Sequence, residues 1–212
     1  MTHYVCIAVI DPGRDPEQET ADLLAPFDEN LAVDPYVEET REDYIAFCRK
    51  EDGRIVNDPS DRSEAHKARM RLLLSDDAFL KAHAELDGLD LNDNGDVVTT
   101  CNPNGKWDWY CTGGRFQEVY EPLQGSKACH VADLMEQRRL VHDRVDGTPT
   151  WCNPHAVVHR DRDGNPEWLE YGNHGWFGTI DTAMTFDAWR RLLTTTLRRH
   201  LSASCMFLDM HI

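Results

Sequence analysis

The stretch "TFDAWRRLLTTTLRRHLSASCMFLDMHI", residues 185–212, predicts a helix followed closely by a strand. Its first part places four apolar side chains in one stripe at helical spacing, namely Phe186, Trp189, Leu193 and Leu197. Thr185 is suited to cap this helix, because its hydroxyl can accept a backbone N–H of the first turn. The final run, "CMFLDMHI", is typical of a buried strand that ends at the last residue.

Two further stretches predict the rest of the sheet. The run "HYVCIAVI" (3–10) is rich in β-formers and closes at "DPG", which indicates a buried strand and a turn. Residues 150–172, "TWCNPHAVVHRDRDGNPEWLEYG", contain two β-rich runs around "DRDGNP", a strong hairpin signal. Strands near both ends, a hairpin and a helix before the last strand favour an α+β fold. We expect an antiparallel or mixed sheet in a ferredoxin-like arrangement.

The first half of the chain has a different character. Residues 37–50 and about 61–86 carry apolar side chains at roughly helical spacing, and "SDD" at 75–77 could divide the second helix by capping a new one. We therefore expect a single domain over 1–212, with a helical, acidic elaboration at about 37–90.

The charge of the chain is uneven. The net charge is -16; residues 1–100 carry 24 acidic and 10 basic side chains, while residues 101–212 carry 14 and 12. An acidic half repels phosphates, so direct nucleic-acid binding through it is disfavoured. No apolar run of about 18 residues is present, which argues against a membrane partner. The start does not resemble a secretion signal, so we expect a cytoplasmic protein with free cysteine thiols.

Metal motifs are incomplete. The loop from Asp90 resembles the first part of a calcium loop, but Cys101 stands where the bidentate glutamate is needed, so a simple turn is the better interpretation. Cys152, His155 and His159 match no zinc spacing. We expect no metal and no cofactor, with a zinc site assembled from distant cysteines and histidines as the alternative. Common nucleophile and phosphate-loop motifs are also missing.

The stretch "NPNGKWDWYCTGGRF" (102–116) is the best candidate for a site. Strand alternation would place Trp107 and Trp109 on a core face and Lys106, Asp108 and Tyr110 on the other. The amides of "TGGRF" could form an anion-binding concavity, although a hairpin bend with an exposed arginine explains the same residues. The predicted ligand-binding residues are Asn102, Lys106, Asp108, Tyr110, Gly113, Gly114, Arg115 and, as a stacking wall, Trp176.

Four blocks of this sequence resemble a family of uncharacterised proteins of tailed bacteriophages. They are "LAPFDENLAVDPYVEET", "NPNGKWDWYCTGGRF", "GWFG" and the terminal "LDMHI", in this order. Family members tend to have tryptophan in place of Phe116 and often cysteine in place of Met210. The resemblance implies a phage-encoded protein in the cytoplasm of a host bacterium and carries no activity with it.

These observations leave three functions open. We expect an accessory protein that binds a small anionic or nucleotide-like ligand at the aromatic, glycine and arginine site. The second hypothesis is a hydrolase or transferase that uses Asp108 with His174 or His211 as acid and base. The third is an acidic interaction protein that inhibits a host factor by mimicking nucleic acid. A host protein is therefore the alternative partner to a small ligand.

Overall fold

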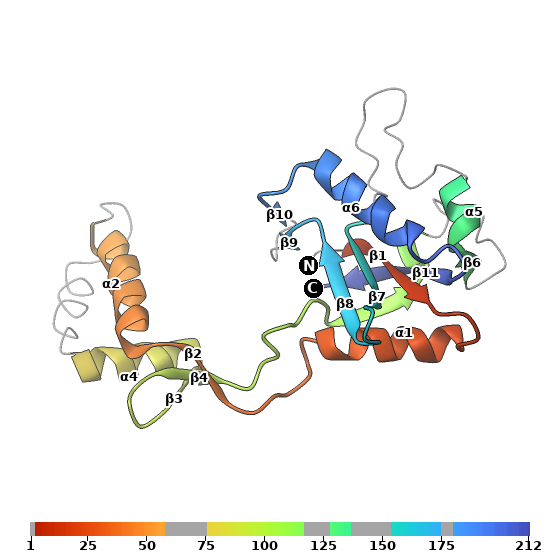
Figure 1. Cartoon of the computed structure of the whole chain (residues 1–212). Coiled ribbons are helices and arrows are strands. Elements are labelled where there is room, and N and C mark those ends of the chain that lie inside the picture. Colours follow the sequence, from red (N-terminus) through yellow and green to blue (C-terminus); the bar gives the residue numbers. More distant parts are fainter. Residues whose placement is uncertain (1–2, 58–75, 117–127, 137–153, 175–179) are drawn as a thin grey trace. The chain divides into compact units, whose positions relative to one another are not determined.

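A computed structural model describes residues 3–57, 76–116, 128–136, 154–174 and 180–212. Its contacts divide the chain into two compact units (Figure 1). Unit 1 consists of Met1–Leu31 and Asn102–Ile212, and unit 2 of Ala32–Cys101. The helical elaboration expected at about 37–90 falls inside unit 2.

Unit 1 is built on a mixed sheet. Strands β1 (His3–Ile10) and β11 (Ser204–His211) pair antiparallel along their whole length. On the other side of β1 lies β7 (Ala156–Arg160), which is parallel to it. The hairpin partner β8 (Pro166–Glu170) follows, and β5 (Trp109–Thr112) pairs with β11, which gives the strand order β5-β11-β1-β7-β8. The predicted strands at both ends and the hairpin are therefore found.

Shorter elements complete unit 1. Strand β6 (Cys129–His130) pairs with the start of β11 and leads into helix α5 (Val131–Glu136). Strands β9 (Asn173–His174) and β10 (Ile180–Asp181) form a separate antiparallel pair. Two 3-10 turns lie at η1 (Ala25–Phe27) and η2 (Gly114–Phe116).

Helices cover both faces of the sheet, as Figure 1 shows for α1 (Pro16–Leu24) and α6 (Phe186–Arg198). Because β1 is buried and mainly apolar from Tyr4 to Ile10, alternate side chains need cover on each face. One core combines β1 with α5 and α6: Val5, Ile7, Val9, Val131, Leu134, Val157, Trp189, Leu193, Leu197, Ala203, Cys205 and Phe207. The other combines β1 with α1: Tyr4, Cys6, Ala8, Ile10, Leu23, Leu24, Ala156, Val158, Met206, Leu208 and Met210.

The predicted α+β fold with a mixed sheet is confirmed. The sheet departs from a ferredoxin-like arrangement in two ways. In the split βαβ unit another strand separates the two parallel strands, whereas β1 and β7 are hydrogen-bonded neighbours. The helices α1 and α6 also pack in different cores on opposite faces.

Local signals explain where the two long helices of unit 1 begin. The Thr185 hydroxyl accepts the Ala188 amide at 3.2 Å, so Thr185 caps α6 as its sequence predicts. The Asp15 carboxylate accepts the Gln18 amide at 3.0 Å and caps α1, whose first residue is Pro16.

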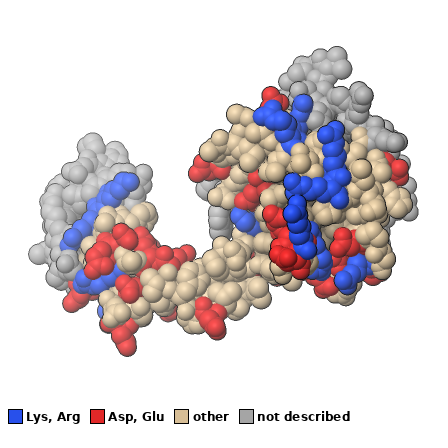
Figure 2. Space-filling model, viewed as in Figure 1, with Lys and Arg blue, Asp and Glu red and all other residues tan. Residues whose placement is uncertain are grey.

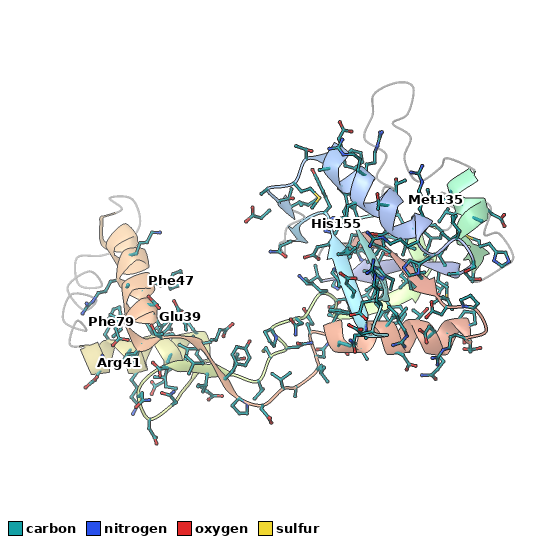
Figure 3. The ribbon with its side chains drawn as sticks, viewed as in Figure 1. Glu39, Arg41, Phe47, Phe79, Met135 and His155 are labelled. Carbon is teal, nitrogen blue, oxygen red and sulfur yellow. The ribbon has the colours of Figure 1, made fainter. Side chains whose placement is uncertain are left out.

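Unit 2 packs two helices on a small sheet. Helices α2 (Arg41–Asn57) and α4 (Asp76–Asp87) accompany strands β2 (Tyr36–Glu39), β3 (Asp90–Leu91) and β4 (Val97–Thr99), which pair antiparallel in the order β2-β4-β3. Their buried side chains are Tyr44, Ile45, Cys48, Phe79, Leu80, Ala84 and Val97. Figure 3 labels Phe79 of this core and the exposed Phe47.

One prediction in unit 2 needs correction, and another can be compared with the structure only in part. The helix expected at 37–50 begins only at Arg41, because residues 36–39 pair with β4 and Thr40 caps the helix by accepting the Asp43 amide. The helix expected at about 61–86 is described only from Asp76 onward, and its earlier part lies outside the described residues.

The loop after Asp90 is a turn stabilised from within. Asn92 Oδ1 accepts the amides of Asn94 and Asp96, at 2.9 and 3.0 Å, while Asp96 Oδ1 accepts the Arg41 amide at 3.0 Å. The Asn92 oxygen is thus engaged by the backbone of the β3–β4 turn, and the Asp96 oxygen by the first residue of α2. Within the described ranges, every helix falls short of the length or apolar composition that a bilayer crossing needs.

Candidate functional site

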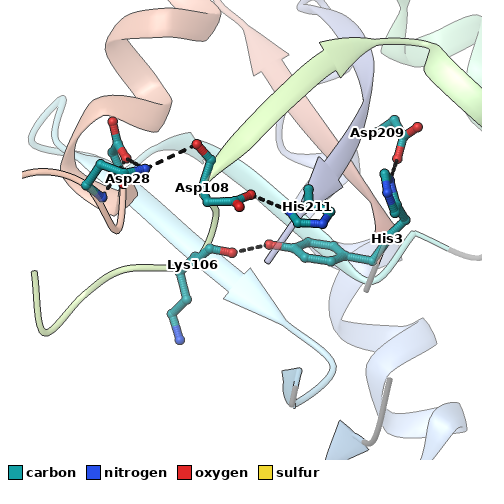
Figure 4. Close-up of polar contacts among 8 residues, drawn as sticks. His3, Asp28, Lys106, Asp108, Asp209 and His211 are labelled. Atoms are coloured by element: carbon teal, nitrogen blue, oxygen red, sulfur yellow. Dashed lines mark hydrogen bonds and ion pairs between the residues drawn. The ribbon is translucent and has the colours of Figure 1, made fainter. Parts of the chain in front are cut away.

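Two histidine–carboxylate pairs lie side by side in unit 1 (Figure 4). His3 begins β1 and His211 ends β11, and the two are directly opposite in the antiparallel register. Their rings are 4.9 Å apart between centroids, in an edge-to-face arrangement. Asp209 lies two positions before His211 on the same face of β11, and Asp108 immediately precedes β5.

The Asp209 carboxylate is buried and held on both oxygens. Only 2% of its side chain is exposed; Oδ1 lies 2.8 Å from His3 Nδ1, and Oδ2 accepts the Arg115 amide at 3.1 Å. The Arg115 guanidinium adds its charge at 3.8 Å, although this side chain is 63% exposed. Asp209 thereby orients the His3 ring.

The second pair joins His211 to Asp108. His211 Nδ1 lies 2.6 Å from Asp108 Oδ1, and the Asp108 amide donates to the His211 carbonyl at 3.0 Å. The His211 side chain is 7% exposed and that of Asp108 27%. Trp109 stacks on the His211 ring at 5.3 Å and is itself 44% exposed, so it presents a flat surface to solvent.

The carboxylates determine where each imidazole carries its proton. An ionised carboxylate only accepts, so the facing Nδ1 atom must be the donor. Nε2 is then the basic nitrogen of the neutral ring. Among the described residues, none hydrogen-bonds to Nε2 of His3 or His211. The Asp–His part of hydrolytic triads has the same arrangement, in which the carboxylate binds Nδ1–H and leaves Nε2 as the base.

The pKa values of two nearby groups, the Glu29 carboxyl and the Cys111 thiol, are raised. Loss of water around Glu29 raises the pKa of its carboxyl, although the residue is exposed overall, and the negative charges of Asp108 and Asp28 add to this rise. Burial raises the pKa of the Cys111 thiol, and Asp209, its register partner, raises it further. Cys111 therefore stays a thiol near neutral pH and is a weak nucleophile.

The predicted strand alternation around Trp107 is wrong. Regular pairing of β5 begins only at Trp109, so Trp107 and Trp109 do not share a face. Trp107 packs on the α1 side of the sheet, where its Nε1 donates to the Leu24 carbonyl at 3.2 Å and its ring meets Tyr110 at 5.2 Å. Trp109 instead lies over the histidine pairs, with its ring 5.4 Å from that of His3.

Other predicted site residues have structural partners. Asn102 is buried, and its side-chain amide donates to the Pro26 and Asp28 carbonyls at 2.8 and 2.9 Å. Lys106 Nζ forms an ion pair with Glu170 at 2.7 Å. Tyr110 packs against the α1 core, where burial raises its pKa.

The predicted anion-binding turn at residues 112–116 contacts a carboxylate of the chain itself, that of Asp209. The Gly113 amide donates to the Phe207 carbonyl at 2.8 Å, and the Arg115 amide donates to the Asp209 carboxylate. At Gly114, with φ of +48°, an added Cβ would lie 2.5 Å from Asp209 Oδ2. The predicted concavity thus receives Asp209 in this structure.

The structure brings Asp108 together with His211, as one hypothesis required. The other partner considered, His174, is placed only by its backbone in β9, and Trp176 with the "GWFG" block lies outside the described residues. His3 and Asp209 escaped prediction. The signal for Asp209 was the pair of polar residues at i and i+2, Asp209 and His211, in the largely apolar terminal strand.

Metal binding has no support in the part of the chain that the structure describes, where no three His, Cys, Asp or Glu side chains gather around a common point. Of the candidates, His155 Nε2 lies 2.7 Å from the Gly172 carbonyl, and Cys152 lies outside the described residues.

Comparison of the chain with protein-family models, curated proteins and solved structures finds no match. The resemblance to a tailed-phage family therefore stays a prediction.

Proposed function

We propose that unit 1 is a hydrolase or transferase in which His211 acts as general base and Asp108 orients it. The observation that carries this proposal is the 2.6 Å contact between His211 Nδ1 and Asp108 Oδ1. It directs the basic Nε2 away from the carboxylate and toward a reacting group. Asp108 also stabilises the imidazolium that forms once Nε2 has accepted a proton.

The nucleophile in this scheme is water or a hydroxyl of the substrate. His211 Nε2 removes the proton from its O–H bond as the oxygen attacks, and the same proton can then pass to the leaving group. The second pair, His3 with Asp209, is close enough to contribute a further proton acceptor, since the two rings are 4.9 Å apart.

A small anionic, nucleotide-like substrate fits the surroundings of this pair. The exposed indole of Trp109 offers a stacking surface, and the exposed guanidinium of Arg115 offers a positive charge. Trp109 thus takes the stacking role predicted for Trp176, and Arg115 takes the anion-binding role predicted for the amides of the glycine turn.

The test is hydrolysis of two aryl esters, para-nitrophenyl phosphate and para-nitrophenyl acetate, followed by release of the coloured phenolate. We expect His211→Gln to lower the rate by about 10²- to 10⁴-fold, the usual contribution of a general base. Asp108→Asn should lower it as well, because the wrong tautomer becomes available. The matched control is His130→Gln, an exposed histidine on β6. Equal rates for wild type and His211→Gln, or no turnover of either ester, would refute the proposal.

Binding without turnover is the second candidate. It is favoured by the exposure of Trp109, which stacks on His211, and of Arg115, which lies near Asp209. A nucleoside monophosphate should then quench tryptophan fluorescence in the wild type and in His211→Gln alike. Trp109→Phe and Arg115→Gln should each weaken the quenching.

A further inference from the structure

A polar cavity of about 640 Å³ lies where the β7–β8 hairpin meets the end of α6. Its lining includes His159 near the end of β7, Glu167 on β8, and Arg199 and His200 just after α6. His211 and His3 lie at the opposite end of the strands. His159 is level with Val9 of β1, so the two sites are separated by about 20 Å along the strands. The cavity is therefore distinct from the site of the proposed reaction.

His159 presents an unsatisfied acceptor in this cavity. Its side chain is only 5% exposed, and Nδ1 lies 2.9 Å from the Arg160 carbonyl. A carbonyl can only accept, so Nδ1 carries the proton and Nε2 of the neutral ring is an acceptor. Nε2 is buried and has no hydrogen-bond partner among the described residues. Buried polar atoms of this kind are rare in folded proteins and call for a partner.

A carboxylate oxygen, which is also an acceptor, lies close to Nε2. Glu167 Oε2 lies 3.5 Å away, and this side chain is 48% exposed. A single donor group placed between these two acceptors can hydrogen-bond to both. A protonated amine is such a group, because it has several N–H bonds and a positive charge. His200 does not oppose a cation here, because burial lowers its pKa and keeps the ring neutral near pH 7.

The cavity also offers uncommitted positive charge. Arg162 and Arg199 line it and form no ion pair with any residue in the described ranges. The third arginine, Arg160, is committed, because its Nε donates to Glu19 at 2.6 Å and its Nη1 to the Gly164 carbonyl at 2.8 Å. Figure 2 shows Lys and Arg side chains beside carboxylates on the visible face of unit 1, so both signs of charge gather there.

The carboxylates of the β7–β8 hairpin also differ in whether they are engaged. Asp161 accepts the amides of Asp163 and Asn165, each at 2.8 Å, and stabilises the turn. Asp163 and Glu167 add two exposed negative charges, so the lining is not that of a simple anion site. It carries acceptor groups and negative charge together with the positive charge of the arginines.

We propose that this cavity binds a small zwitterion, an organic ammonium that also bears a phosphate or a carboxylate. The ammonium donates to His159 Nε2 and Glu167, and the anionic group pairs with the guanidinium groups of Arg162 and Arg199. This binding is independent of the reaction proposed at His211.

Isothermal titration calorimetry at pH 7.5 tests the proposal with two zwitterions, O-phosphoethanolamine and β-alanine, which separate phosphate from carboxylate. We expect at least one to bind, and ethanolamine and inorganic phosphate, which each carry one half of the pattern, to bind at least about tenfold more weakly. Absence of heat with both zwitterions, or equal binding of inorganic phosphate, would overturn it.

Variants assign the two halves of the site. Glu167→Gln and Arg199→Gln are at exposed positions and should each weaken zwitterion binding about tenfold or more. His159→Phe removes the acceptor, and Arg191→Gln, on the exposed side of α6 and outside the lining, is the matched control. Unchanged binding in Glu167→Gln and Arg199→Gln would contradict the assignment, even if His159→Phe fails to fold.

Discussion

The buried carboxylate of Asp209 leaves no space for a side chain at position 114. A Cβ on Gly114 would lie 2.5 Å from both Asp209 Cβ and Oδ2, and the backbone there has a positive φ. We expect Gly114→Ala to lower the free energy of unfolding by about 2 to 4 kcal/mol, combining backbone strain with the overlap. The control is Gly13→Ala, where φ is also positive but no atom lies within 4 Å. It should cost only about 1 kcal/mol.

Urea denaturation of both glycine variants measures this difference. Equal losses at Gly114 and Gly13 would show that the Asp209 carboxylate moves away at little cost, and that the His3–Asp209 pair is not fixed.

His155 makes the stability of unit 1 depend on pH. Burial lowers its pKa to about 4, and the charge of Lys106 adds to this, while the hydrogen bond with the Gly172 carbonyl opposes it. The unfolded chain takes up a proton below the ordinary pKa of about 6.5, whereas the folded chain does not until about pH 4. Stability is therefore complete above about pH 6.5 and falls as the pH decreases toward 4, by about 3 kcal/mol.

The variant His155→Gln isolates this contribution. Its free energy of unfolding, measured in urea at pH 7 and at pH 4.5, should change less between the two pH values than that of the wild type. His130→Gln, at an exposed position, should keep the wild-type difference. A wild-type pH profile in His155→Gln would show that another group causes the loss.

At the scale of elements, prediction succeeded where a local signal and burial agree. Strand β1 has the predicted limits, and α6 begins after its predicted cap Thr185. The β7–β8 hairpin turns at Asp161, whose carboxylate accepts two amides of the turn. In each case the signal lies within the element or in the residues next to it.

Elements that depend on distant partners were less predictable. The segment from Tyr36 to Glu39 resembles a helix start in sequence, but β4, sixty residues later in the chain, pairs with it as a strand. The alternation expected from Trp107 failed because the chain joins β11 only from Trp109. Sequence periodicity carries no information on such long-range pairing.

At the scale of the whole molecule, the same limit applies to the candidate site. Asp108 and His211 could be proposed as a pair from their chemistry, yet their contact joins residues 103 positions apart. His3 and Asp209 are separated by 206 positions and meet only because β1 and β11 are neighbours in the sheet. A single sequence lists the reactive groups, and the strand order decides which of them meet.

The two units have separate hydrophobic cores. Among the described residues, both cores of unit 1 are formed by its own two segments, and the core of unit 2 by residues between Tyr44 and Val97. The two segments of unit 1 also lie next to each other where unit 2 is inserted between them. The Asn102 side chain donates to the Asp28 carbonyl, and the Glu29 amide donates to the Trp107 carbonyl. A short connection can therefore replace unit 2 without stretching unit 1.

We expect a chain in which residues 32–101 are replaced by about six Gly and Ser residues to fold with unit 1 intact, because closing a shorter loop costs little. Near-ultraviolet circular dichroism should retain the signal of buried Trp189, and urea unfolding should remain cooperative. As a control, Leu193→Ala should destabilise unit 1 by about 2 to 5 kcal/mol, by the same amount in the shortened and the full chain. A shortened chain that unfolds without a cooperative transition would show that unit 1 needs residues 32–101 to fold.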